Sequence, residues 1–347
     1  MKSPFRFVSF LLFLLYAFIL SCTSYQVLCE NDRPIIGVLT LPPKDPDNYS
    51  GEIVASYVKW LESAGAQAAV LPYSLDANEF KLLLSSLNGV LLTGGADFIE
   101  LDPDSDYIKA VRMILDKAKE FQGFSQSERE AIRDGNPGSV VERADFFPVW
   151  GTCLGFEAII CVENMSKEDT LSQSTDYKNV SLPVEITSEA DNSLLFENNQ
   201  DIISSLSDAS NPIPFHNHQW IIPIETFVNS YRLSGSYSIL GYTEFCGDNC
   251  TPSVTIVEHF LYPIFATAFH PEKNAFEWAL SYNINHSSIA VGVMQTLSQT
   301  FVDYAKMNSN MFLSEDEQDS HLIYNYSPTY TGKDSQSTTT QVYYLPI

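Results

Sequence analysis

Short apolar segments alternate with longer segments of helical periodicity along the first half of the chain. Four continuously apolar segments predict buried strands: 33–42, 68–72, 89–95 and 147–151. Between and after them, apolar residues recur at helical spacing in four further segments: 54–66, 79–87, 106–120 and 154–162. Because strands that alternate with helices form parallel sheets, this pattern predicts an α/β domain with a mostly parallel central sheet.

The second half of the chain is less regular. Segments 236–244, 253–260 and 262–272 predict three further strands, and 290–307 predicts a final helix. The stretch 214–223 fits neither period, and a polar tail with an aromatic cluster at 322–332 follows the final helix. A polar connection occupies 121–145. With no internal repeat and no linker, we expect one domain over residues 30–347.

The N-terminus has the layout of a secretory signal peptide. Lys2 and Arg6 precede an apolar run over 7–20, and small residues follow at 21–24. We expect residues 1–24 to be removed, with cleavage after Ser24 or as late as Cys29. The alternative is an uncleaved membrane anchor, although the run is short for a membrane span. No later segment is long and apolar enough to cross a membrane, so the processed chain is expected to have no membrane partner.

The formal net charge of −24 excludes two classes of partner. Neither nucleic acid nor an anionic lipid surface attracts so acidic a chain. The charge fits the secretory pathway, with a lysosome, a vacuole or the extracellular space as the destination. Six N-x-S/T sequons are candidate glycosylation sites: Asn48, Asn164, Asn179, Asn249, Asn285 and Asn325.

The cysteines leave one thiol of special interest. Cys246 and Cys250, in FCGDNC, are either a disulfide or two free loop thiols. Cys161 lies on a predicted helix and is expected to be a buried structural thiol. If Cys246 and Cys250 pair, Cys153 is left without an obvious partner and is a candidate reactive thiol.

Cys153 also lies where a predicted strand becomes a predicted helix, in the pattern Gly151-x-Cys153-x-Gly155. This is the cysteine form of a nucleophile elbow, in which glycines allow a tight, strained turn. The first N–H groups of the helix, starting at Leu154, would face a substrate oxyanion, and the helix dipole would favour a thiolate. A buried structural thiol between two flexible residues is the alternative.

A base and further backbone donors follow other strands. His270 ends an apolar segment and Glu272 follows it two residues later, an arrangement that orients an imidazole or forms an ordinary surface turn. Gly94 and Gly95 follow the segment 89–92. Their N–H groups would complete an oxyanion hole with Leu154, or belong to a plain strand-to-helix turn. In a doubly wound sheet all of these groups would reach one crevice.

The chain resembles the gamma-glutamyl hydrolase family, which is related to class I glutamine amidotransferases. The matching segments are RPIIGVL, ASYVKWLESAGA, NGVLLTGG, FFPVWGTCLGFE, NHQW, YPIFATAFHPEKNAFEW and LIYNYSPTYTG, in family order. The resemblance implies a three-layer α/β/α sandwich of the class I glutamine amidotransferase-like, flavodoxin-like type. It also implies that Cys153 is the nucleophile, His270 the acid and base, and Glu272 the orienting carboxylate.

The same resemblance assigns further residues. His218 of NHQW matches a further active-site histidine that contacts substrate, with Gly94 beside it, while His216 is expected to be a loop histidine. The oxyanion hole is expected at Leu154 and Gly95. Thr93 and Phe269 depart from the family pattern, which leaves pocket shape and preferred substrate length open.

The implied activity is cysteine-dependent hydrolysis of γ-glutamyl bonds in folylpoly-γ-glutamates and antifolate analogues. The partner is then a small-molecule substrate. Neither a cofactor nor a metal is expected, and homodimers occur in the family. One alternative is an amidase or glutaminase of the same fold, which would lack its usual synthetase partner here. The other is a secreted binding protein that has lost catalysis.

Overall fold

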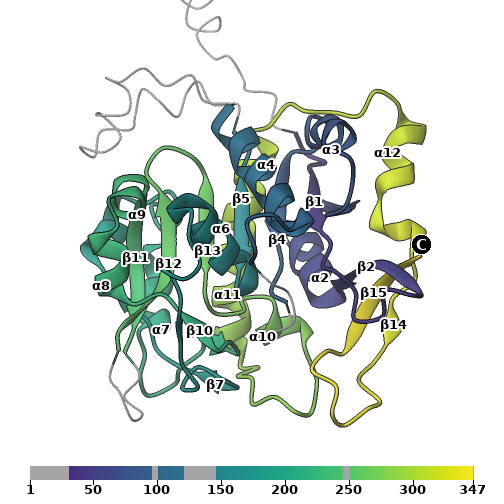
Figure 1. Ribbon diagram of the computed structural model, residues 1–347. Coiled ribbons are helices and arrows are strands. Elements are labelled where there is room, and N and C mark those ends of the chain that lie inside the picture. The colour runs from purple at the N-terminus through teal and green to yellow at the C-terminus, as the bar shows by residue number, and fades with distance from the viewer. Residues whose placement is uncertain (1–30, 96–100, 121–145, 245–250, 347) are drawn as a thin grey trace, which may run out of the picture. The chain divides into compact units, whose positions relative to one another are not determined.

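Apolar strands that are buried on both faces form the centre of the molecule. The computed structural model describes residues 31–95, 101–120, 146–244 and 251–346. The predicted signal peptide, the 121–145 connection, the pair Cys246 and Cys250, and Asn249 lie outside the described residues. Residues 31–347 are one compact unit. The eight-stranded sheet has the order β3-β1-β4-β5-β13-β12-β11-β8 (Figure 1).

Five neighbouring strands of this sheet are parallel and three are antiparallel. The parallel strands are β3 (Gln67–Leu71), β1 (Ile35–Leu39), β4 (Gly89–Leu92), β5 (Val149–Thr152) and β13 (Ile264–Thr267). The antiparallel strands are β12 (Ser253–His259), β11 (Tyr237–Thr243) and β8 (Glu185–Ile186). The predicted mostly parallel sheet is confirmed.

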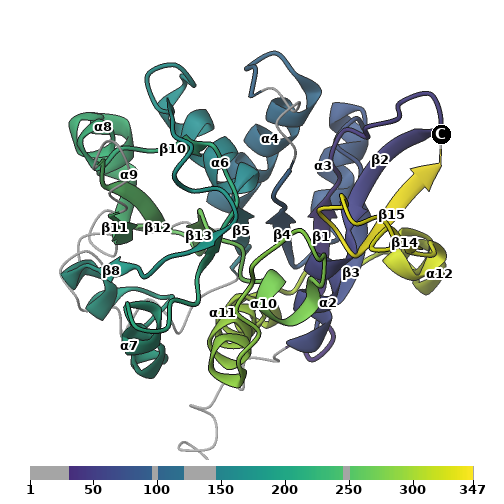
Figure 2. The same ribbon diagram turned by 90° about the horizontal axis from the view of Figure 1, so that it is seen from below.

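Helices cover both faces of the sheet and complete three layers, as predicted. One face carries α3 (Ala77–Leu84), α4 (Asp106–Glu120), α6 (Leu154–Asn164), α8 (Ile224–Asn229) and α9 (Tyr231–Ser236). The other carries α2 (Ala55–Ser63), α7 (Ile203–Leu206) and α11 (Ser288–Lys306). Figure 2 shows the two groups on opposite sides of the sheet.

The alternation of side chains along each strand produces two cores. In β1, Ile35 and Leu39 pack against the α4 and α6 face, whereas Ile36 and Val38 pack against the α2 and α11 face. On the second face Trp60, Trp150 and Phe301 join helix to sheet, with ring centroids 5.2 to 6.5 Å apart.

The C-terminal segment departs from the expectation of a polar tail. It contains α12 (Glu315–His321), β14 (Thr329–Tyr330) and β15 (Gln341–Pro346). β15 pairs antiparallel with β2 (Tyr49–Val54), so that the chain end lies against a segment almost 300 residues earlier. The sequence pattern did not predict either strand, because their pairing depends on tertiary contacts.

The irregular segment between β5 and β11 is held by two short antiparallel pairs. β6 (Ser172–Gln173) pairs with β10 (Trp220–Ile221), and β7 (Val180–Ser181) pairs with β9 (Phe215–His216). This segment brings the histidine-rich stretch 214–223 to the carboxyl edge of the sheet, because the backbone N–H of His270 donates to the carbonyl of Phe215 at 2.9 Å.

Candidate active site

A strained residue forms the turn between β5 and α6. Cys153 has φ 52° and ψ −107°, a backbone conformation that costs energy in a non-glycine residue. Its N–H donates to the carbonyl of Thr267 at 2.9 Å, and its carbonyl accepts from the N–H of Glu157 at 2.9 Å. Backbone hydrogen bonds to the adjacent strand and to the helix therefore hold Cys153 at the carboxyl edge of the sheet.

Gly151 and Gly155, which flank Cys153, are needed for the close packing of α6 on the sheet and not for the backbone conformation of the turn. A Cβ on Gly155 would lie 2.3 Å from the carbonyl oxygen of Leu92, and one on Gly151 would lie 2.5 Å from Cδ1 of Ile159. Neither glycine has a positive φ. The expected role of the glycines is therefore corrected: they let α6 approach the sheet, while Cys153 itself takes the strained conformation.

His270 and Glu272 form a buried pair. Nδ1 of His270 lies 2.8 Å from Oε1 of Glu272, and the two residues are 5% and 0% exposed. Because a carboxylate only accepts, Nδ1 carries the proton, which leaves Nε2 as the nitrogen that can take one. The strand predicted over 262–272 ends at Thr267, three residues before His270. The surface-turn alternative for His-Pro-Glu does not hold, because both side chains are buried.

Gly94 lies between the two groups expected to react. A Cβ on Gly94 would be 2.7 Å from Cε1 of His270 and 3.2 Å from Cβ of Cys153. Only a residue without a side chain fits at this position. The imidazole and the cysteine therefore meet at the end of β4, as the sequence predicted.

Tyr57 belongs to this cluster and was missed in the sequence, where it looked like one apolar residue of a helical stripe. Its hydroxyl accepts from the N–H of Gly94 at 2.7 Å and lies 3.2 Å from Nδ1 of His270. Since the Nδ1 proton is directed to Glu272, the hydroxyl proton of Tyr57 is available to Glu272 as well. No local signal distinguishes this tyrosine from a core residue.

Gly94 and Gly95, which follow β4, differ in whether their backbone N–H groups are available to bind a substrate. The N–H of Gly94 is already donated to Tyr57, so Gly94 has no free N–H for a substrate. Gly95 is exposed. The N–H of Leu154 lies beside the sulfur of Cys153 and favours its ionised form. An oxyanion hole at Leu154 and Gly95 stays a prediction.

Burial opposes the charged form of both reacting groups. Burial raises the pKa of Cys153 well above its usual value and the charge of Glu157 raises it further, against the lowering by the Leu154 N–H. These effects oppose the thiolate expected at the helix N-terminus, which the N–H of Leu154 favours. Burial also lowers the pKa of His270, which Glu272 offsets only in part. Burial opposes ionisation of Glu272, yet the contact with His270 holds its pKa below the usual value.

His216 and His218 form a second buried pair, beside the pair of His270 and Glu272. Nδ1 of His218 lies 2.8 Å from the carbonyl of Trp220, and Nε2 of His218 lies 3.0 Å from Nδ1 of His216. Both ring nitrogens of His218 are therefore used inside the protein. The expectation of a loop position for His216 is wrong: it lies in β9, is fully buried, and its Nε2 has no partner among the described residues.

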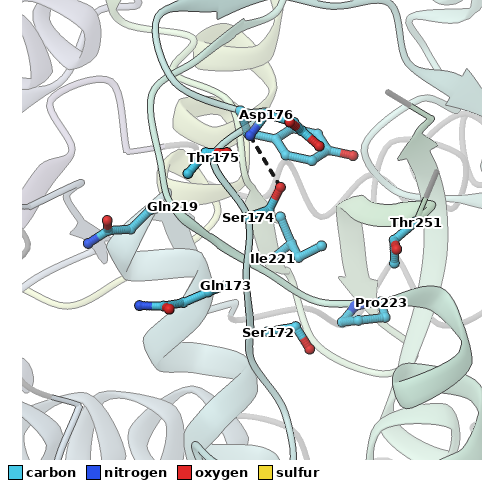
Figure 3. A pocket seen from close by; sticks show the side chains of 10 residues that line it. Ser172, Gln173, Ser174, Thr175, Asp176, Gln219, Ile221, Pro223 and Thr251 are labelled. Carbon is cyan, nitrogen blue, oxygen red and sulfur yellow. Dashed lines mark hydrogen bonds between the residues drawn. The ribbon is translucent and has the colours of Figure 1, made fainter. Parts of the chain in front are cut away.

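Tyr177 joins this histidine pair to a neighbouring cavity. Its ring stacks on that of His218 with centroids 5.3 Å apart, and the same residue lines a cavity of about 470 Å³ (Figure 3). The other lining residues are mostly hydroxyl and amide side chains: Ser172, Gln173, Ser174, Thr175, Asp176, Gln219, Ile221, Pro223 and Thr251. With one carboxylate and no cation among these described lining residues, the cavity suits a neutral polar group.

The remaining predicted positions lie away from this cluster. Cys161, on α6, is a buried free thiol, and burial raises its pKa. Of the described sequons, Asn48, Asn179 and Asn325 are exposed, whereas Asn164 and Asn285 are half-buried. Within the described ranges, no helix is long and apolar enough to cross a membrane, and no three His, Cys, Asp or Glu side chains are arranged to hold a metal ion.

Comparisons with known proteins find relatives that match most of the chain. A family model described as Peptidase C26 matches residues 34–181. Gamma-glutamyl hydrolase of Homo sapiens is 32% identical over 304 residues, which are 86% of this chain and 86% of that protein. Gamma-glutamyl hydrolase B of Dictyostelium discoideum is 32% identical over 88% of this chain and 81% of its own length. The glutaminase domain of Trypanosoma brucei CTPS with bound acivicin has a TM-score of 0.48 at 13% identity, covering 80% of this chain and 95% of that one.

Proposed function

The chain belongs to the gamma-glutamyl hydrolase family, and we propose that it cleaves γ-glutamyl bonds in folylpoly-γ-glutamates and their antifolate analogues. The products are glutamate or short γ-linked polyglutamate. The observation that carries the proposal is the strained Cys153 at the end of β5, meeting the buried pair His270 and Glu272 across Gly94.

Acylation is the first half of the reaction. As the sulfur of Cys153 attacks the γ-carbonyl carbon, its proton passes to Nε2 of His270. The oxyanion is held by backbone N–H groups at Leu154 and Gly95. The tetrahedral intermediate then breaks its C–N bond. His270 returns the proton to the departing α-amino nitrogen of glutamate, and a thioester remains on Cys153.

Deacylation reverses these roles. Nε2 of His270 removes a proton from water, the hydroxide oxygen attacks the thioester carbonyl, and the thiol of Cys153 leaves with the proton from His270. Glu272 fixes the proton on Nδ1 throughout and stabilises the imidazolium that forms twice per cycle. Tyr57 positions the pair, because its hydroxyl joins the Gly94 backbone to the side chains of His270 and Glu272.

The neutral resting state fits this sequence of steps. With the pKa of the thiol raised and that of the imidazole lowered, no stable ion pair precedes the substrate. Proton transfer then occurs together with carbon–sulfur bond formation, where the new charge moves onto the oxyanion.

The predicted signal peptide and sequons support a secretory route, to a lysosome, a vacuole or the outside of the cell. A homodimer belongs to the same proposal. The intact cluster opposes a catalytically silent binding protein, since every group that the mechanism needs is present.

The test follows product lengths from a fluorescent pteroyl-poly-γ-glutamate, using the chain from residue 30 at acidic and neutral pH. We expect glutamate-shortened products from the wild-type protein. Cys153→Ala should lose them by a factor of about 10³ or more. The matched variant Cys161→Ala removes the other described free thiol on the same helix and should keep the products. Equal background from wild type and Cys153→Ala would reject the assignment.

A further inference from the structure

One lysine beside the active site has no anionic partner. Lys273 follows Glu272 directly, begins α10 (Lys273–Phe276) and is only 5% exposed. Among the described residues, no carboxylate lies within 4.0 Å of its ammonium and no hydrogen-bond acceptor contacts it. Within the described residues, the ammonium lies over the face of the Tyr282 ring, with Nζ 4.9 Å from the ring centroid. A buried ammonium without a direct ion-pair partner is costly, and its charge acts on Glu272 and Cys153 only through space, so an anion from a ligand would stabilise it.

The neighbouring acids are engaged elsewhere. Oε1 of Glu272 is hydrogen-bonded to His270. Oε1 of Glu277 accepts from the N–H groups of Trp278 and Ala279 at 3.0 and 3.1 Å. The charge of Lys273 lowers the pKa of Glu272, and the Oε2 atoms of Glu272 and Glu277 have no hydrogen-bond partner among the described residues. Neither side chain makes a direct ion pair with Lys273, so the ammonium can still pair directly with a ligand.

The positive charge of Lys273 affects the pKa of the nucleophile, Cys153. Burial is the main cause of the raised pKa of Cys153, and the positive charge of Lys273 opposes that shift. The hydroxyl of Tyr282 accepts from Nδ2 of Asn217 at 2.9 Å, and Asn217 lies between His216 in β9 and His218 in the loop that follows. Lys273, Tyr282 and Asn217 therefore form a cation with polar neighbours next to Cys153.

We infer that Lys273 binds the free α-carboxylate of a glutamate flanking the scissile γ-glutamyl bond. The inference rests on the proposed function and names the group of the substrate that is recognised. In a γ-linked chain each glutamate keeps its α-carboxylate, whereas an ordinary α-peptide bond consumes it. A buried cation beside the nucleophile thus distinguishes γ linkage from α linkage. It also offsets locally the repulsion between a polyanionic substrate and a chain of net charge −24.

The test compares Lys273→Met, which keeps the apolar stem, with wild type on pteroyl-γ-glutamyl-glutamate. Two further substrates carry a carboxamide in place of one α-carboxylate, on the acyl side or on the leaving side. We expect Lys273→Met to raise KM for pteroyl-γ-glutamyl-glutamate about 10- to 100-fold, a larger change than the one in kcat. The rise should vanish for the substrate that lacks the contacted carboxylate. Lys273→Arg should retain part of the affinity, which separates loss of charge from loss of folding.

Lys306→Met is the matched control. The backbone carbonyl of Lys306 accepts from Asn31, just before β1, so this lysine lies at the amino edge of the sheet, opposite Cys153. It should leave KM unchanged. An equal KM rise for acid and amide substrates in Lys273→Met would overturn the inference, because a merely structural lysine affects both.

Binding separates failure of this inference from failure of the proposed function. In a Cys153→Ala background, which cannot form the thioester, Lys273→Met should weaken binding of pteroyl-γ-glutamyl-glutamate by the same factor, measured by fluorescence titration. If wild type cleaved no γ-glutamyl bond, this titration would still decide whether Lys273 holds the carboxylate. Equal dissociation constants with and without Lys273 would reject it.

Discussion

The two sides of the active site are built in different ways. On one side, Cys153 and His270 follow neighbouring parallel strands, and backbone hydrogen bonds fix them at the sheet edge. On the other, His216 and His218 lie in an irregular segment held by two-residue strands and by each other's side chains. The regular side presents reactive groups, whereas the irregular side supplies two buried rings that are hydrogen-bonded to each other.

This difference indicates that one side of the site serves the reaction and the other serves stability. Strand ends position chemistry accurately because the sheet is rigid, while a segment with few backbone ladder bonds relies on buried polar side chains. We therefore expect substitutions on the regular side to change the rate of the chemical steps. Substitutions on the histidine-rich side should change stability and its dependence on pH. Three predictions test this comparison.

The largest effect is expected for Glu272→Gln. An amide NH₂ group facing Nδ1 of His270 favours the tautomer with its proton on Nε2, which removes the base, so kcat should fall roughly 10³-fold or more. Steady-state kinetics on a γ-glutamyl substrate measure it. Glu258→Gln is the control: this buried carboxylate accepts from Leu194 and Leu195 N–H groups outside the cluster, and its loss should lower stability and spare kcat. Near-normal kcat in Glu272→Gln would contradict the role given to this carboxylate.

A smaller effect is expected from acid on the histidine-rich side. Burial lowers the pKa of His218 from 6.5 to about 4, so the folded state keeps this ring neutral. The unfolded chain therefore binds more protons between these values, and the stabilisation is lost as pH falls from about 6.5 through about 4. The loss is roughly 3 kcal/mol.

Urea unfolding at pH 7.5, 5.5 and 4 measures this effect. His218→Gln lacks the titrating group, so its free energy of unfolding should approach or exceed that of wild type as pH falls. Parallel pH curves for the two proteins would show that the pair His216 and His218 does not respond to acid in this way.

The smallest effect is expected for Tyr57→Phe. The N–H of Gly94 loses its acceptor, so unfolding becomes easier by about 1–3 kcal/mol and kcat falls about tenfold as the imidazole is held less firmly. Tyr107→Phe is the matched control, because the hydroxyl of Tyr107 is also buried but has no hydrogen-bond partner in the described part of the chain. Identical behaviour of the two variants in thermal unfolding and kinetics would remove Tyr57 from the cluster.

The difference between the regular and the irregular side also explains which features were predictable from sequence. The strands before Gly94 and Cys153 are continuous apolar runs, and a strand-to-helix turn with a central cysteine is a local pattern. The sequence therefore predicted the sheet, the helices and the meeting of Cys153 with His270. It did not predict that burial opposes the thiolate, because the helix dipole is a local effect whereas burial depends on the whole fold.

Long-range packing accounts for what the sequence did not predict. β2 and β15 pair across almost the entire chain, and neither shows strong alternation on its own. Tyr57 has the spacing of a core residue, and only the approach of Gly94 and His270 makes its hydroxyl matter. His216 lies in a stretch without clear periodicity, and its partner His218 is brought close by the pairing of β7 with β9.

The most direct test of the central claim is a rapid acid quench of a single turnover, followed by mass spectrometry of the protein and its peptides. The account predicts an acyl adduct that appears within the first turnover and maps to the peptide containing Cys153. His270→Ala should slow its formation. An adduct on Cys161, or release of the glutamate product with no adduct on the protein at any time, would contradict nucleophilic catalysis by Cys153.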